Sequence, residues 1–166
     1  MSGEGVHNPA DTTTLEEAIA IVQADVNGIL DSVAHTSIIF PADTNLICTF
    51  TALNTANTFS AWAEIVDSMA NKLSDAIGST HGHISSILVE TMSEDSAIYM
   101  YEIAYGAAKT VIVRERFAGV GKFIQANMQN RFWTLPFPTG QLLYYRMKTE
   151  TAVADTCTVH FRCHSE

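Results

Sequence analysis

Two different periods of apolar residues divide this chain. Between positions 15 and 33 six apolar residues are spaced by 4, 3, 4, 3 and 4, which is the heptad pattern of a helix with one apolar seam. The seam consists of Leu15, Ile19, Val22, Val26, Ile29 and Val33. After His35, apolar and polar residues alternate with the period of two that is typical of β-strands. We therefore expect a tail and helical arm over residues 1–35 and a β-domain over residues 36–166.

The helix should begin near position 13, where Thr13 with Glu16, or Thr14 with Glu17, forms a capping box. β-Branched residues at both core positions of the heptad favour a three-stranded coiled coil. A helix that lays its apolar face on its own domain remains an alternative, because three heptads are short and Gly28 costs about 1 kcal/mol in a helix interior. We predict self-association through the seam, as a homotrimer.

About eight strands follow the helix, and short turns separate them. The expected extended segments are Thr36–Phe40, Leu46–Leu53, Thr58–Ser68, Lys72–Ile77, His83–Met92, Ala97–Tyr105, Lys109–Phe117, Phe123–Phe137 (one strand or two), Gln141–Thr149 and Thr156–His164. The third of these segments is also compatible with a helix and is assigned to a strand because its neighbours are strands. No helical crossovers appear between the strands, so the sequence predicts a mainly β fold, an antiparallel β-sandwich of jelly-roll type with one N-terminal α-helix.

Composition restricts the classes of partner that we expect for this chain. Eighteen acids against nine bases give a net charge of −9, and no Lys/Arg cluster is present, so nucleic acid is not an expected partner. Charged residues make up only 16%, which favours a surface partly buried against other subunits. No apolar run approaches the roughly 20 residues of a membrane helix, and the first residues lack a signal-peptide pattern, so we expect synthesis in a cytoplasm. Of the three cysteines, Cys157 and Cys163 share one strand face and should be core residues.

Candidate chemistry is sparse. No nucleophile, phosphate-loop or zinc motif occurs. His81 and His83 offer two ligands where a structural zinc site needs four, so we interpret them as solvated turn histidines. His160, Arg162 and His164 share one strand face and form a possible interface stripe. If this stripe faces a subunit contact, acid should charge its histidines and weaken assembly between about pH 7 and 5.

Two further residue classes have both a functional and a structural interpretation. Acid pairs could serve glycoside hydrolysis, and the candidates are Glu64, Asp67, Glu90, Glu94 and Asp95. Aromatic side chains could form a sugar platform, and the candidates are Tyr99, Tyr101, Tyr105, Trp133, Tyr144 and Tyr145. Acidic chains always contain acid pairs, and sandwich cores use aromatics. We therefore predict no enzymatic activity, no metal and no cofactor.

The second half of the chain carries a recognisable order of short motifs. They are Trp62-Ala-Glu64-Ile65-Val-Asp67, His83-Ile84, Leu88-Val89-Glu90, Tyr101-Glu102-Ile103-Ala104-Tyr105-Gly106, Pro138-Thr-Gly140-Gln-Leu-Leu-Tyr144-Tyr145-Arg146 and Thr158-Val159-His160-Phe161-Arg162. This order resembles small β-sandwich virion proteins of tailed bacteriophages, over roughly residues 36–164. In that family a YxIxxG strand precedes a PxGxxIxxR strand and a final alternating strand.

The resemblance implies a capsid decoration, fibre or other accessory protein and supplies no catalytic residues. The expected partners are further copies of the chain and other virion proteins such as the major capsid protein. The expected location is the virion, after assembly in the host cytoplasm. The main alternative is a carbohydrate-binding module of a receptor-binding appendage, and a glycoside hydrolase is a more distant one.

Overall fold

The computed structural model describes residues 9–33, 36–78, 81–119, 130–131, 134–138 and 140–165. Contacts divide the chain into two units, Met1–His35 and Thr36–Glu166. The described part of the first unit is helix α1, Pro9–Val33. This helix begins before the predicted start near position 13, because Pro9 can occupy the first helical position, where its fixed φ suits a helix and its missing N–H costs nothing.

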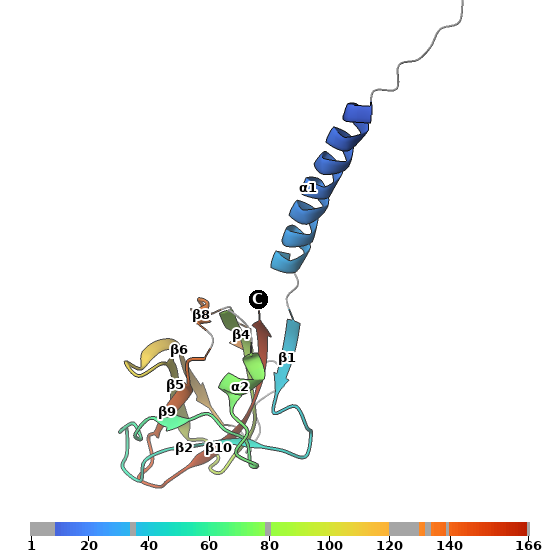
Figure 1. The fold of residues 1–166 in the computed structure, drawn as a ribbon. Helices are drawn as coiled ribbons and strands as arrows, with labels where there is room; N and C mark the ends of the chain where they lie inside the picture. The colour runs from blue at the N-terminus through green and yellow to red at the C-terminus, as the bar shows by residue number, and fades with distance from the viewer. Residues whose placement is uncertain are drawn as a thin grey trace, which may run out of the picture. The chain divides into compact units, whose positions relative to one another are not determined.

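The second unit contains two antiparallel sheets (Figure 1). In sheet A, β10 (Thr156–Ser165) lies between β1 (Thr36–Phe40) and β4 (His81–Met92), and β2 (Cys48–Thr51) also pairs with β10. Two short strands, β7 (Asn130–Arg131) and β8 (Phe137–Pro138), pair with β4. Most of the predicted segment Phe123–Phe137 lies outside the described residues.

Sheet B has the order β3-β9-β5-β6. Its strands are β3 (Ala63–Glu64), β9 (Leu143–Thr149), β5 (Ile98–Tyr105) and β6 (Thr110–Ala118). All the pairings between its strands are antiparallel. The prediction of a mainly β chain with antiparallel sheets and one N-terminal helix is therefore confirmed.

Aromatic side chains join the two sheets. Phe50 of β2 stacks on Tyr145 of β9, with ring centroids 4.0 Å apart, and its ring meets Tyr101 of β5 at 5.6 Å in an edge-to-face arrangement. All three side chains are buried, and so is Phe161 of β10, whose ring lies 6.1 Å from that of Phe50. Burial of large aromatic surfaces is the main energetic gain in such cores. The interpretation of Tyr101 and Tyr145 as core residues is confirmed.

The prediction of a strand over Lys72–Ile77 is wrong. The segment forms a short helix, α2 (Leu73–Ile77), which contacts β1 and β10. Leu73 and Ile77 are both buried, and a spacing of four residues brings them to the same face of a helix. Gly78 ends the helix with a φ of 51°, a left-handed conformation that glycine adopts without a steric penalty.

Most of the predicted strand Thr58–Ser68 is also absent, since only Ala63 and Glu64 pair in a ladder. The preceding residues follow β9 as an irregular segment, in which Asn57 donates a backbone hydrogen bond to Thr149 and Ser60 donates one to Met147. Two such bonds without a regular register do not make a ladder. This segment, residues 54–62, is called the β9 flank below.

All three cysteines are buried thiols. Burial raises the pKa of Cys48 to about 12, with a smaller contribution from the negative charge of Asp67, and burial alone raises that of Cys163 to about 12. The pKa of Cys157, packed with its Sγ atom 3.5 Å from Met147 Sδ, is raised as well by burial and by Cys48. The predicted core role of Cys157 and Cys163 is confirmed.

These thiols should resist modification while the protein is folded. We expect a disulfide reagent such as DTNB at pH 8 to label the native chain about 100-fold more slowly than free glutathione, because the thiolate is the reactive form. In 6 M guanidinium chloride, three thiols per chain should react at the rate of a free thiol. Rapid labelling of any thiol in the native protein, followed by absorbance, would contradict this burial.

Candidate binding surfaces

The predicted interface stripe lies on the outer face of sheet A. His160 and His164 are half-buried and Arg162 is exposed, and all three alternate with the buried residues of β10. A hollow of about 200 Å³ lies beside them and is lined partly by Ile39, Leu88 and Glu90. Ile39 is 52% exposed, so this surface combines apolar and charged groups. The structure thus brings the predicted stripe together and adds neighbours from β1 and β4.

Glu90 of β4 is a neighbour of the stripe on the same sheet. Its Oε1 atom lies 2.7 Å from Nδ1 of His160, and both side chains are partly exposed. The expected weakening of assembly in acid stays a prediction.

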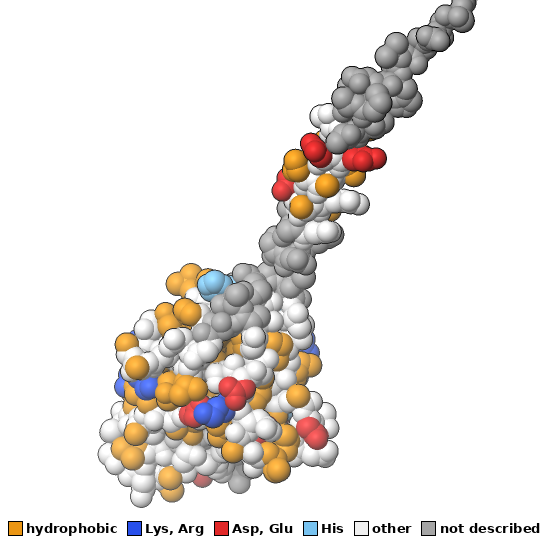
Figure 2. Space-filling model, viewed as in Figure 1, with side chains coloured by type: hydrophobic (Ala, Val, Ile, Leu, Met, Phe, Trp, Pro, Cys, Tyr) orange, Lys and Arg blue, Asp and Glu red, His pale blue; other side chains and the backbone are white. Residues whose placement is uncertain are grey.

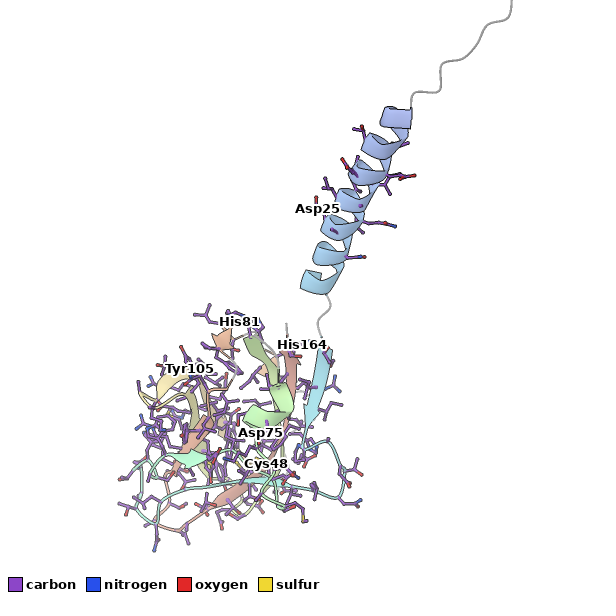
Figure 3. The ribbon with its side chains drawn as sticks, viewed as in Figure 1. Asp25, Cys48, Asp75, His81, Tyr105 and His164 are labelled. Carbon is purple, nitrogen blue, oxygen red and sulfur yellow. The ribbon has the colours of Figure 1, made fainter. Side chains whose placement is uncertain are left out.

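His81 and His83 do not form a pair of solvated turn histidines. Both belong to β4, where His81 is exposed but His83 is only 4% exposed, so the prediction for His83 is wrong. The Nδ1 atom of His83 lies 3.0 Å from the carbonyl oxygen of Thr134, and the Thr134 hydroxyl accepts a hydrogen bond from the backbone of Ile84. A segment fifty residues further along the chain therefore covers this histidine. Figure 3 shows His81 at the end of β4.

The outer face of sheet B holds a buried carboxylate that the sequence analysis did not single out. Glu102 of β5 is fully buried, although its position in the strand points away from the sandwich core. Arg114 of β6 and Arg146 of β9 stand opposite it on the two flanking strands. The Nε atom of Arg114 donates to Glu102 Oε1 at 2.5 Å, and that of Arg146 donates to Oε2 at 2.6 Å. The Nη2 atom of each guanidinium contacts the same oxygen at 2.5 Å, so each carboxylate oxygen of Glu102 binds one arginine.

Aromatic rings of the β9 flank cover Arg146. Its guanidinium carbon lies 4.5 Å from the ring centroid of Phe59 and 4.6 Å from that of Trp62, which are cation–π distances. Further along this face, the Nζ atom of Lys109 lies 3.0 Å above the ring of Tyr144. Among the candidate platform rings, Tyr144 therefore has one face covered by a cation of the protein itself. Tyr99 is buried like Tyr101 and Tyr145, and Trp133 lies outside the described residues.

A hollow of about 210 Å³ opens beside the ion-paired carboxylate. Its floor is formed by Ile98 and Met100 of β5, and its walls include Arg116 of β6 and Lys148 of β9. Met100 is directly opposite both basic residues in the ladder. Glu150 also lines the hollow, and its carboxylate accepts a hydrogen bond from the backbone of Ile98. The result is an apolar floor between two cationic side chains.

A third, more open hollow of about 390 Å³ is lined by Phe40, Leu46, Asp67, Asn71 and Lys72 among others. Burial tends to raise the pKa of Asp67, but hydrogen bonds from the Asn71 side chain and from the backbone of Asn71 and Met69 bring it below its ordinary value. This carboxylate stays ionised and fixes a loop.

The acids considered for hydrolysis have structural partners or lie in a turn. Glu64 pairs with Lys72 at 3.0 Å, and Glu94 and Asp95 are exposed in the turn between β4 and β5. No three His, Cys, Asp or Glu side chains among the described residues are arranged to hold a metal ion.

The apolar seam of α1 is exposed in the described part of the helix. Leu15, Ile19, Val22 and Val26 expose between 47% and 61% of their surface. The side chains of Ile29 and Val33 lie outside the described ones. Within the residues that the structure describes, no helix has the length and apolar character needed to cross a membrane. The helix therefore displays a line of aliphatic groups to water.

Comparisons with known proteins give little further information. No protein-family model matches this chain, and no curated protein matches it. Among solved structures, it is similar to VP2 in the crystal structure of the infectious bursal disease virus VP2 subviral particle, with a TM-score of 0.38 and 12% identity. The alignment covers 81% of this chain and 33% of the VP2 chain, so this chain spans about a third of that protein's length. This likeness assigns no role to the chain.

The buried carboxylate gives a stability prediction. Glu102→Gln should lower the free energy of unfolding by about 2 kcal/mol, because it leaves two facing guanidinium groups without a full counter-charge, and their partial exposure screens part of the loss. Urea unfolding followed by circular dichroism measures the change. The control is Glu150→Gln on the same face, where the exposed carboxylate should matter by less than about 0.5 kcal/mol. Equal stability of the two variants would show that the ion pairs contribute nothing net.

Proposed function

We propose that this chain is a structural protein that works by self-association through its helical arm. The observation that carries this proposal is the exposed seam of α1, where four aliphatic side chains at heptad spacing have about half or more of their surface in water. Apolar area contributes about 25 cal/mol per Å² when it is buried, so a seam of this kind gains free energy by pairing with another apolar surface. The rest of the seam, at Ile29 and Val33, follows from the sequence.

A three-stranded coiled coil is the association that the seam favours. Its a positions (Ile19, Val26, Val33) and its d positions Val22 and Ile29 are β-branched, and this combination disfavours a two-stranded coil. The helix of Pro9–Val33 would be about 37 Å long at 1.5 Å per residue, which is enough for three heptads. We therefore propose a homotrimer.

The particle in which the chain serves is proposed from the sequence resemblance. The motif order over residues 36–164 supports a component of a virus particle, and more finely a decoration or accessory protein of a bacteriophage capsid. Its partners would then be its own copies and other virion proteins such as the major capsid protein, and its location the virion. A non-enzymatic role agrees with acids that serve structural contacts, such as Asp67 and Glu102. The glycan-binding alternative has less support because Tyr99, Tyr101 and Tyr145 are buried and Lys109 covers one face of Tyr144.

The seam is tested by placing a charge in it. Val26→Asp should convert the oligomer to monomers, because each coil would bury three carboxylates against one another. Multi-angle light scattering coupled to gel filtration measures the mass, and the β-sheet circular dichroism signal should stay unchanged. The matched control is Ala20→Asp, an exposed position of the same helix away from the seam, which should keep the wild-type mass. An unchanged mass for Val26→Asp would refute the role of the seam.

The proposed location has its own test. Intact particles of the virus that encodes this chain should carry it in fixed stoichiometry through a density gradient, as judged by quantitative mass spectrometry. If the chain stays in the soluble fraction while the major capsid protein bands with the particles, the virion proposal fails and the self-association proposal is unaffected.

A further inference from the structure

The outer face of sheet B contains a row of three side chains with a basic–apolar–basic order. Arg116, Met100 and Lys148 occupy directly opposed positions on the adjacent strands β6, β5 and β9. Strands in a sheet are about 4.8 Å apart, so the backbones that carry the two cations are about 10 Å apart. Arg116 is exposed, and Met100 and Lys148 are half-buried in the same hollow of about 210 Å³. This set is called the basic row.

Neither cation of the basic row forms an ion pair within the part of the chain that the structure describes. The neighbouring carboxylate on the same strand, Glu102, is fully engaged by Arg114 and Arg146. Glu150 is the one acid that lines the hollow, and its Oε1 atom accepts a hydrogen bond from the backbone N–H of Ile98. The Nζ atom of Lys148 lies 4.9 Å from the ring of Phe59 and in no ion pair. Together with Arg114 and Arg146, four of the nine bases of an acidic chain lie on this one face.

Helix α1 carries a complementary set of side chains. Glu17, Ile21 and Asp25 are four residues apart, so they form one line along the helix, with about 6 Å between neighbours. This acidic stripe lies about 120° around the helix from the seam, and Ile21 is 63% exposed although the seam gives it no role. Acidic and apolar side chains are visible together on the helix in Figure 2, and Figure 3 shows Asp25 projecting from it.

Charge is divided unevenly between the two units. Residues 1–35 contain six acids (Glu4, Asp11, Glu16, Glu17, Asp25, Asp31) and neither Lys nor Arg. Residues 36–166 hold all nine bases against the remaining twelve acids, which leaves them a net charge of −3. The complementarity is therefore local, between the acidic stripe and the basic row, where opposite charges steer two surfaces together and fix their register.

We propose that the acidic stripe of one copy docks on the basic row of a second copy. The carboxylates of Glu17 and Asp25 meet the cations of Arg116 and Lys148, and Ile21 lies over Met100. The spacings agree, since about 12 Å separates the two acids and about 10 Å the strands of the two bases. This inference rests on the proposed self-association and adds a second contact to it. Glu17 and Ile21 occupy the outer f and c positions of the heptad, and Asp25 flanks the seam at g.

Zero-length cross-linking tests the contact in the full chain. A mixture of ¹⁴N- and ¹⁵N-labelled protein is treated with a carbodiimide, which joins a lysine amine only to a carboxylate in contact with it. Mass spectrometry should find Lys148 linked to Glu17 or Asp25 in mixed heavy–light pairs. These pairs should decrease at 1 M NaCl, where the screening length falls from about 10 Å at 0.1 M to about 3 Å. Links found only within one chain, or an oligomer without any such link, would overturn the proposal.

Charge reversal gives an independent readout. Arg116→Glu/Lys148→Glu should weaken association about tenfold in sedimentation velocity at 0.1 M NaCl. Glu17→Lys/Asp25→Lys, which leaves the sandwich untouched, should do the same, and an equimolar mixture of the two variants should recover association. The control is Thr44→Glu, which adds an acid to the exposed loop between β1 and β2 and should leave association unchanged. Wild-type association in both double variants would refute the docking.

The two proposals can fail separately. If Val26→Asp produces monomers but neither charge reversal has an effect, the seam alone holds the oligomer and the docking proposal is wrong. If none of these variants changes the mass, self-association through the arm is wrong as well. If Arg116→Glu/Lys148→Glu abolishes retention on a heparin column while the mass stays unchanged, the basic row serves a foreign polyanion and the docking proposal is overturned.

Discussion

The stacking of Phe50 on Tyr145 is the contact on which the rest of the body depends, because it ties a strand of sheet A to a strand of sheet B. The rings of Tyr101 in sheet B and Phe161 in sheet A also pack against Phe50, so the inner faces of both sheets are buried in the core. Polar and charged side chains that alternate with this core must then point outward. For that reason both candidate surfaces of the body lie on the outer faces of the sandwich, and neither is a deep pocket.

Long strands were predictable from the sequence, and short elements were not. The alternation in β5, β6, β9 and β10 runs over seven or more residues, and no helical pattern fits such a run. In α2, by contrast, five residues carry only Leu73 and Ile77 as apolar signals, and their spacing fits a helix while their neighbours suggested a strand. The strand predicted over Thr58–Ser68 was wrong for a different reason. It begins in the β9 flank, whose backbone hydrogen bonds to β9 depend on tertiary packing that the local pattern does not encode.

The candidate surfaces also divide into one that was predictable from the sequence and others that were not. The stripe of His160, Arg162 and His164 was predictable because alternation within one strand is enough to define it. The ion pairs of Glu102 required knowledge that β6 and β9 flank β5, and a single sequence gives the facing direction of each residue but not its neighbours across the sheet. His83 was misjudged because its cover comes from Thr134, fifty residues away in the chain.

The position of β1 has a mechanical consequence. Helix α1 ends at Val33 and β1 begins at Thr36, so any tension applied to the helix reaches the body through β1. Within the described residues the ladder partner of β1 is β10, which also carries β2 and β4. Because β1 is the edge strand of sheet A, a pull on the helix loads the five residue pairs of the β1–β10 ladder first. That ladder belongs to sheet A, so the basic row of sheet B does not lie on this path.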